Sequence, residues 1–152
     1  MSKEVTSRLP GRIMAVDPGE SRHGVALSDP TRLLAWPYGV VLRRSRQQDF
    51  EQFAAIAASE GVTQLLVGLP QAIHEPDTPF TAWVRDYAAS LSRHLDLPLS
   101  FIDESFSTID ASSALEAQGK RRWQRQREHI DAGAAAVILQ QYLDQQRHEP
   151  GV

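Results

Sequence analysis

Short apolar runs, each ended by a turn signal, recur along this chain of 152 residues and predict buried strands. The first run, Arg12–Val16, stops at Asp17, Pro18 and Gly19, and a second run, His23–Leu27, begins only a few residues later. So short a connection predicts an antiparallel hairpin. A third strand is expected within Ala35–Leu42, where Pro37 favours the edge of a sheet.

Beyond the third strand, helical and strand patterns alternate. The first predicted helix is capped by Ser45, runs to Glu60 and is ended by Gly61. It is followed, in chain order, by a strand over Gln64–Val67, a helix from Thr78 and Pro79 to Leu95, a strand over Pro98–Ile102, a helix from Ser107 to about Gln118, and a final helix opening at Asp131. Strand–helix–strand crossovers make the later strands parallel to one another. The predicted fold class is therefore α/β, a mixed sheet flanked by helices.

Composition narrows the class of protein further. The chain has no cysteine, which excludes thiolate zinc sites, iron–sulfur clusters and cysteine nucleophiles. Hydrophobic residues make up 41% and charged residues 23%, and no apolar run approaches the roughly 18 residues of a membrane helix. We expect a flexible tail over 1–11, a single domain over 12–147, a C-terminal tail over 148–152, and a cytoplasmic location with no membrane association.

Three carboxylates follow from the predicted topology. Asp17 comes just after the first strand, Glu104 just after the fifth, and Asp131 opens the last helix. Open α/β sheets place ligands along the carboxyl edge of their strands, where these groups and Gly68 would meet. Oxygen ligands of this kind suit hard divalent cations. Each residue also has an ordinary interpretation: Asp17 as a turn former, Glu104 as a surface charge, and Asp131 as a partner of the helix dipole.

Small residues follow Asp131 in the final helix. Alanines fill most of 132–136, and Gly133 costs roughly 1 kcal/mol in a helix interior. We interpret Gly133 as the sign of a helix that presses close to the sheet and carries Asp131 toward Asp17. A plain alanine-rich helix explains the alanines but not the glycine.

Positive charge is concentrated in two places although the formal net charge is −3. The larger group lies between positions 120 and 127 and comprises Lys120, Arg121, Arg122, Arg125 and Arg127. A smaller group comprises Arg43, Arg44 and Arg46. Local fields of this kind steer anionic ligands even when the net charge is negative, although a basic run is also typical of a solvated surface.

Four segments, in order, resemble the motifs of a known family. They are 17–30 (DPGESRHGVALSDP), 67–70 (VGLP), 103–108 (DESFST) and 131–140 (DAGAAAVILQ). Together they resemble the YqgF/RuvX proteins, ribonuclease-H-like relatives of Holliday junction resolvases that are also described as pre-16S rRNA nucleases. The resemblance spans about residues 12–145.

The resemblance implies a ribonuclease-H-like sheet of order 3-2-1-4-5, in which the first strand is central and parallel to the fourth. It also implies that Asp17, Glu104 and Asp131 form a catalytic triad that holds Mg²⁺ or Mn²⁺, with water as the nucleophile. Strand five would lie two spacings, about 10 Å, from strand one, so Glu104 has the longest reach of the three. Two departures bear on substrate preference: Ser105 replaces the family's arginine, and 71–76 replaces its glycine-containing loop.

Other residues near the triad have open roles. Arg22 is interpreted either as a phosphate clamp or as a turn-stabilising partner of Asp17. The basic segment 120–127 would hold the nucleic-acid backbone, and Trp123 would either stack on an unpaired base or pack within the protein. His129 is interpreted as a proton-transfer group near Asp131 or as an exposed loop residue.

The function predicted from these residues is that of a metal-dependent endonuclease, a hydrolase of phosphodiester bonds in structured nucleic acid. Its substrate would be branched, Holliday-junction-like DNA, precursor 16S rRNA at its 5′ end, or both, placing it in recombination and repair or in ribosome biogenesis. The alternative is a binding adaptor of the same fold with little catalysis. An actin-like ATPase lobe is a third interpretation, but such enzymes enclose nucleotide between two lobes and this chain has length for one. The expected assembly is a monomer or a homodimer.

Overall fold

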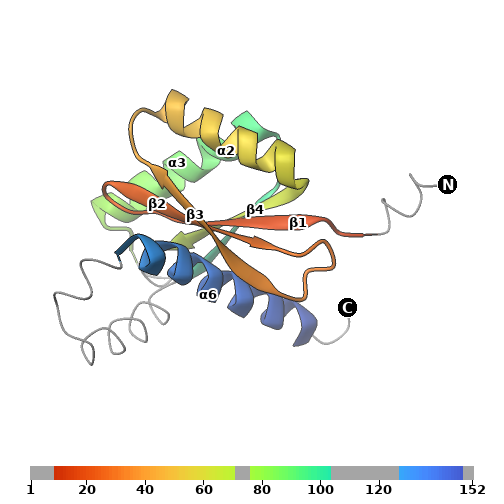
Figure 1. Cartoon of the computed structure of the whole chain (residues 1–152). Coiled ribbons are helices and arrows are strands. Elements are labelled where there is room, and N and C mark those ends of the chain that lie inside the picture. The colour runs from red at the N-terminus through yellow and green to blue at the C-terminus, as the bar shows by residue number, and fades with distance from the viewer. Residues whose placement is uncertain (1–8, 71–75, 104–126, 149–152) are drawn as a thin grey trace.

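The computed structural model describes residues 9–70, 76–103 and 127–148, with side chains in the last stretch described from Ala132 to Arg147. The described elements are drawn in Figure 1 and are, in chain order, β1 (Arg12–Asp17), β2 (Arg22–Ser28), β3 (Ala35–Leu42), α2 (Arg46–Glu60), β4 (Val62–Leu69), α3 (Pro79–Leu95), β5 (Leu99–Asp103) and α6 (Arg127–His148). Each predicted strand is present, within two residues at either end. The helix predicted from Ser107 lies outside the described residues.

The strands form one sheet of order β3-β2-β1-β4-β5. β1 is central; it pairs antiparallel with β2 and parallel with β4, which is parallel to β5. This arrangement confirms the predicted mixed sheet and the strand order that the family resemblance implies. Because β3 is antiparallel to β2, it runs in the direction of β1. The carboxyl ends of β1, β3, β4 and β5 therefore share one edge of the sheet.

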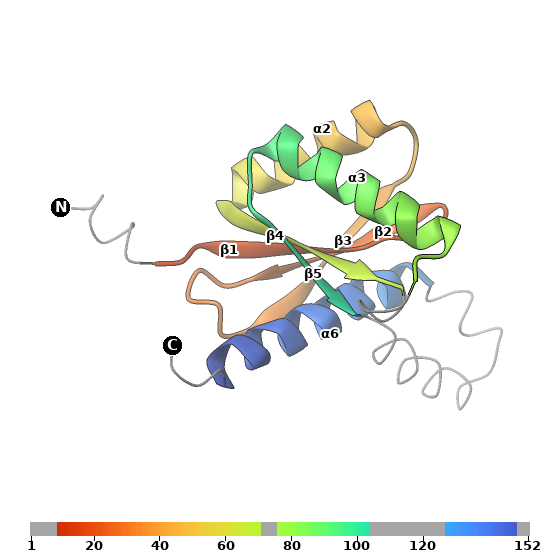
Figure 2. The same cartoon turned by 180° about the vertical axis from the view of Figure 1, so that it is seen from behind.

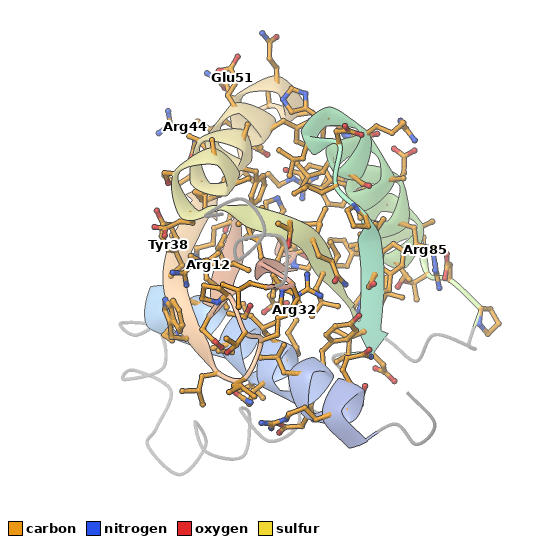
Figure 3. The ribbon with its side chains drawn as sticks, turned by 90° about the vertical axis from the view of Figure 1, so that its right-hand side faces the viewer. Arg12, Arg32, Tyr38, Arg44, Glu51 and Arg85 are labelled. Carbon is orange, nitrogen blue, oxygen red and sulfur yellow. The ribbon has the colours of Figure 1, made fainter. Side chains whose placement is uncertain are left out.

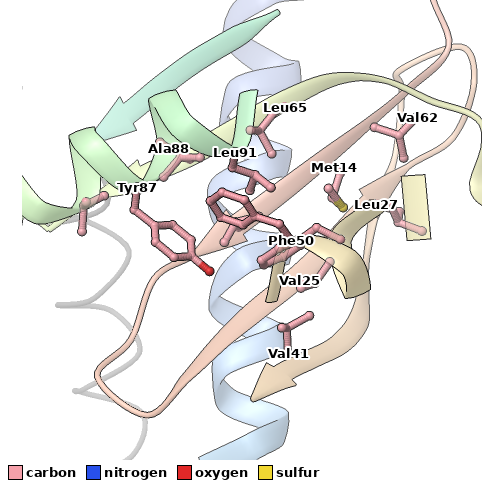
Figure 4. Close-up of a cluster of buried hydrophobic side chains, with 14 of the residues drawn as sticks. Met14, Val25, Leu27, Val41, Phe50, Val62, Leu65, Tyr87, Ala88 and Leu91 are labelled. Atoms are coloured by element: carbon pink, nitrogen blue, oxygen red, sulfur yellow. The ribbon is translucent and has the colours of Figure 1, made fainter. Parts of the chain in front are cut away.

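Helices cover both faces of the sheet, α2 and α3 on one and α6 on the other (Figures 1 and 2). Side chains alternate between the two faces along β1, as they must in a strand. Met14 and Val16 join the cluster under α2 and α3, part of which Figure 4 shows. Ile13 and Ala15 join the cluster under α6. Full burial of one large apolar side chain contributes about 1.5–3 kcal/mol, so both layers stabilise the central strand.

The ends of α2 and α3 follow the predicted capping residues. Ser45 is the N-cap of α2, where its side chain accepts a hydrogen bond from the Gln48 N–H, and Gly61 ends the helix in the left-handed conformation. Thr78 caps α3 in the same way, ahead of Pro79. Such caps satisfy backbone groups that a helix end leaves unpaired. These helices therefore begin at the carboxyl edge of the sheet, where β3 and β4 end.

The outer strand β3 carries an irregularity at the predicted edge proline. Val25 of β2 pairs with Gly39, whereas Ala26 pairs with Pro37, so Tyr38 is an extra residue in β3. An edge position leaves the missing N–H of proline without consequence for the sheet. Pro37 therefore lies where the sequence predicts it.

Arg32 links the strands at the amino edge of the sheet, which Figure 3 shows facing the viewer. Its guanidinium donates to the carbonyl oxygen of Gly11 at 2.9 Å and to the Gln64 side chain at 2.9 Å. Gln64 in turn donates to Ser100 and to Tyr142 of α6. These bonds tie the strands to α6 at the edge opposite Asp17. No helix among the described residues has the length and apolar character needed to cross a membrane.

Candidate functional site

Asp17 is the last residue of β1, at the carboxyl edge of the sheet. Ile13 and Ala15 face α6, so strand alternation places Asp17 on the face of the sheet that α6 covers. Its side chain is half-buried, and its direct neighbour in β2 is Gly24, which has no side chain. The central strand therefore presents a carboxylate at the edge where α/β proteins bind ligands.

The beginning of α6 lies at this same edge, as both views of the fold show (Figures 1 and 2). The helix packs on β1, β2 and β3. It begins at Arg127 and not at Asp131, so the predicted start of the final helix is wrong by four residues. Residues 127–130 include Arg127 and Glu128, good helix formers, and contain no helix breaker, which is why the helix extends past the predicted cap. Asp131 is thus inside the first turns of α6, and its side chain lies outside the described residues.

Alanines make the close contact between α6 and the sheet. Ala132 and Ala135 are buried, and Ala135 packs against Ala15 and Ala26 in one cluster. Gly133 has a different position: a Cβ built there would meet no atom of the described residues within 4 Å. The interpretation of Gly133 as a close-packing residue is therefore wrong. The alanines on the adjacent face of the helix fill that role.

The turn that follows Asp17 depends on Gly19. A Cβ at this position would lie 2.2 Å from the carbonyl oxygen of Arg22, a contact that the backbone itself would have to relieve. The Gly19 N–H donates to Nδ1 of His23 at 3.2 Å. The turn is therefore tight, and its first half is held by a side chain from β2.

His23 is fully buried among aromatic rings. Its ring centroid lies 5.1 Å from that of Tyr87, 6.1 Å from that of Phe53 and 6.3 Å from that of Trp83. Because Nδ1 accepts a hydrogen bond, the neutral ring carries its proton on Nε2, which is buried and has no hydrogen-bond partner among the described residues. Burial lowers the pKa of His23 to about 4; the Asp49 carboxylate opposes this shift and the Arg43 guanidinium adds to it. His23 is therefore a neutral hydrogen-bond acceptor at neutral pH.

Arg43 holds the second half of the same turn. Its Nη1 donates to the carbonyl oxygen of Glu20 at 3.1 Å, and its backbone N–H donates to the carbonyl oxygen of Ser21 at 3.0 Å. The guanidinium lies 3.9 Å from the centroid of the Trp83 ring, a cation–π contact. The segment between β1 and β2 is thus fixed from both sides by His23 and Arg43.

A buried carboxylate completes this aromatic layer. Asp49 is only 1% exposed, and both of its oxygens accept hydrogen bonds at 2.9 Å, one from the Arg44 N–H and one from the Tyr87 hydroxyl. Burial raises the pKa of Tyr87 above its usual range, and the bond to Asp49 raises it further. The start of α2 is therefore anchored to α3 directly behind the turn.

Arg22 begins β2 and shares a sheet face with Asp17. In β2, His23, Val25 and Leu27 face α2 and α3, so Arg22 is placed by alternation on the α6 face. Its side chain is half-buried. Both interpretations of Arg22, clamp and turn partner, require this face.

The remaining predicted site residues lie outside the part of the chain whose side chains are described. They are Glu104, Asp131, Lys120, Arg121, Arg122, Trp123, Arg125 and Arg127. For Arg127 and Asp131 the structure gives the helix position only. β5 ends at Asp103, opposite Leu69 of β4, which brings the chain to the carboxyl edge one residue before Glu104. Among the described residues, no group of three or more Asp, Glu, His or Cys side chains is placed to hold a metal ion.

Sequence reasoning assigned no role to His23 and treated Arg43 only as part of a basic cluster. A signal for His23 was present, because it alternates with Val25 and Leu27 and so falls on the core face of a strand. A buried histidine at such a position needs a hydrogen-bond partner nearby. No sequence signal reported the contact between Arg43 and Trp83, which joins segments 40 residues apart.

Comparisons with known proteins agree with this geometry. A family model described as "RuvX: Holliday junction resolvase" matches residues 11–145. A protein of Maridesulfovibrio salexigens named "Putative pre-16S rRNA nuclease" is 38% identical over 133 residues, covering 87% of this chain and 97% of the relative. A protein of Symbiobacterium thermophilum with the same name is 40% identical over 140 residues, covering 91% and 96%.

One solved structure supports the fold alone. T. thermophilus RuvC in complex with a Holliday junction substrate superposes with a TM-score of 0.51 at 12% identity, covering 90% of this chain and 96% of that one. The fold of this chain, with its sheet order β3-β2-β1-β4-β5, is therefore ribonuclease-H-like. On the strength of the family match and the relatives over most of its length, the chain belongs to the RuvX (Holliday junction resolvase) family.

Proposed function

We propose that this protein is a nuclease that hydrolyses phosphodiester bonds in structured nucleic acid, with Asp17, Glu104 and Asp131 as the acidic residues of its active site. The observation that carries the proposal is the position of Asp17: it ends the central strand on the face covered by α6, whose beginning lies at the same edge. Membership of the RuvX family and relatives named as nucleases support catalysis over the binding-only alternative.

The three acidic residues suit Mg²⁺ or Mn²⁺, because carboxylate oxygens are the ligands these ions take and the chain offers no thiolate. A divalent ion at such a site supplies an activated water and charge neutralisation of the phosphate. Asp17 fits the role of ligand because its half-buried carboxylate stands at an open sheet edge. His23 and Arg43 hold the turn that follows, so the backbone next to Asp17 is fixed.

The basic segment 120–127 would bind the nucleic-acid backbone next to this centre, with Arg22 as a further cation on the same face as Asp17. Trp123 would stack on an unpaired base. Replacement of Arg121, Arg122 and Arg125 by alanine is expected to flatten the dependence of log affinity on log salt. The reason is that fewer phosphate contacts form, so binding releases fewer counterions. An unchanged slope would remove this segment from the interface.

The deciding experiment is a cleavage assay on three substrates: a four-way DNA junction, linear duplex DNA, and a precursor 16S rRNA fragment containing the 5′ end. Each is incubated with Mg²⁺, Mn²⁺ or a chelator. We expect metal-dependent cleavage that Asp17→Asn reduces by about a hundred-fold, equivalent to ~2.7 kcal/mol in the barrier. Asp144→Asn, the same change on a half-buried acid near the far end of α6, is the matched control and should cleave normally. Full activity of Asp17→Asn would reject the proposed centre.

The substrate that the protein cleaves best distinguishes junction resolution from maturation of precursor rRNA. Preference for the junction over linear duplex would indicate junction resolution, which requires two symmetric cuts and hence favours a dimer. Preference for the rRNA fragment would indicate 5′ end maturation. Binding of all three without cleavage in any metal would leave only the adaptor.

A further inference from the structure

We propose that Arg43, Arg44 and Arg46, here called the β3–α2 arginine cluster, bind the phosphate backbone of the nucleic-acid substrate. This inference rests on the nuclease function proposed above and adds a contact surface on the other side of the sheet from α6. The ligand is the phosphodiester backbone that DNA and RNA share.

The arginine cluster lies at the same edge of the sheet as Asp17. β3 ends at Leu42 and α2 begins at Arg46, so the three arginines stand at the carboxyl edge of the sheet. β3 is two strands from β1, so the two strands are about 10 Å apart along that edge. Successive phosphates of a duplex strand rise about 3.4 Å along its axis. A strand cut beside Asp17 would therefore pass the cluster within a few nucleotides.

Two of the arginines are already held in place. Arg43 is bound to the Glu20 carbonyl oxygen and stacked 3.9 Å over Trp83. Arg46 pairs with Asp86 at 2.9 Å, donates to Ser90 at 3.3 Å, and lies over the same Trp83 ring at 5.8 Å. A guanidinium has five N–H donors, so these contacts leave others available for phosphate oxygens. Since their conformations are restricted beforehand, little side-chain entropy is lost on binding.

Arg44 is the outward member of the cluster. It is exposed, and its guanidinium makes no hydrogen bond or ion pair with any described residue, although its backbone N–H is bound to the buried Asp49. Figure 3 shows this side chain projecting from the molecule beside α2. The backbone of Arg44 is therefore fixed, while no described residue occupies its guanidinium, which can bind a phosphate.

The charged side chains around the cluster indicate how many phosphates it can contact. Residues 42–48 contain three arginines and no acid, and Asp49 is buried with both oxygens engaged. Asp86 offsets the charge of Arg46, so Arg46 would contribute N–H donors and little net charge. Arg43 and Arg44 remain, and Glu20 and Glu51 on the adjoining segments limit any wider positive field. The cluster should thus contact about two phosphates.

The test measures binding as a function of salt. Fluorescently labelled 20-nucleotide single-stranded RNA and DNA are titrated with full-length protein between 50 and 300 mM KCl. The Asp17→Asn background is used because we expect it to slow cleavage by about a hundred-fold during the titration. The added variants are Arg43→Ala, Arg44→Ala, the pair together, and Arg44→Lys. The matched control is Arg93→Ala, an exposed arginine in the last turn of α3 at the opposite edge of the sheet.

We expect each single alanine variant to lower the slope of log affinity against log salt by about 0.7, and the pair by about 1.4, on both nucleic acids. Arg44→Lys keeps the charge and should keep the slope, as should Arg93→Ala. Thermal unfolding of each variant shows whether Arg43→Ala disturbs the turn; Arg44→Ala removes no described side-chain contact and stands as the clean variant.

The outcomes separate the two proposals. If the protein cleaves and binds nucleic acid but the slope of the double variant matches that of Arg93→Ala, the arginine cluster is rejected and the nuclease stands. If Arg43→Ala, made in the protein with Asp17 intact, slows cleavage while the slope of the binding assay is unchanged, Arg43 only positions the turn and the cluster is likewise rejected. If the protein neither binds nor cleaves, the proposed function fails first, and this inference fails with it.

Discussion

Acid should destabilise this protein through His23, and the size of the effect follows from the structure. The His23 ring is fully buried, and burial lowers its pKa from 6.5 to about 4. As the pH falls through 6.5, the unfolded chain takes up a proton on this histidine while the folded protein does not. The free energy of unfolding therefore decreases with falling pH until the folded form also binds the proton near pH 4.

The magnitude follows from linkage. A pKa lowered from 6.5 to about 4 corresponds to a total loss of about 3 kcal/mol, of which about 2 kcal/mol has been lost by pH 5. Small domains are stable by only about 5–15 kcal/mol, so the loss is large enough to measure. The Gly19 N–H also loses its acceptor when Nδ1 is protonated, so the same transition releases the turn that follows Asp17.

The assay compares urea unfolding of the parent protein and His23→Leu at pH 7, 6, 5 and 4.5. Carboxylates that titrate in this range are common to both proteins, so the difference between the two free energies of unfolding isolates His23. The variant is expected to be less stable than the parent at pH 7, because it lacks the acceptor for Gly19. Between pH 7 and pH 5 the free energy of unfolding of the parent should fall relative to that of the variant by about 2 kcal/mol. His94→Gln, a change at an exposed histidine, should follow the parent throughout. A difference that stays constant within about 0.5 kcal/mol across this range would refute the reasoning.

Three further substitutions test individual features of the fold. Gly19→Ala forces a Cβ to within 2.2 Å of the Arg22 carbonyl oxygen, so we expect a loss of about 1–3 kcal/mol in urea unfolding and a drop in cleavage beyond the unfolded fraction. Gly133→Ala adds a Cβ that meets none of the described residues within 4 Å and should stabilise α6 by about 0.5–1 kcal/mol. A lower melting temperature would restore the packing role rejected above. Ser45→Ala removes the acceptor for the Gln48 N–H and should cost about 1 kcal/mol, which Ser45→Asp should largely restore.

Sequence patterns predicted the elements of this fold well because the relevant signals are local. Ser45, Gly61 and Thr78 mark helix ends through bonds to residues three or four positions away, so the sequence contains both partners. Pro37 identified an edge strand because it lacks a backbone N–H. The sheet order came from the family resemblance, since apolar runs alone do not say which strands pair.

The predictions that were wrong, or incomplete, depend on distant contacts. The role given to Gly133 required knowing which face of α6 meets the sheet, and Ala132 and Ala135 make that contact. The function of His23 depends on Gly19, Trp83 and other residues brought together only by folding. Of the predicted triad, Asp17 alone has a described side chain, and all three residues remain predictions as ligands.

The alternation of side chains along β1 links the two halves of this protein. Its even-numbered residues, Met14 and Val16, pack beneath α2 and α3, while Ile13, Ala15 and Asp17 face α6. A slip of one residue in the register of β1 would exchange these faces and bury Asp17 in an apolar cluster, at a cost of several kcal/mol. The apolar packing of both layers therefore selects the register that places this carboxylate on the α6 face. The turn after it is then fixed from the opposite layer, by His23 and Arg43, so neither layer alone positions the site.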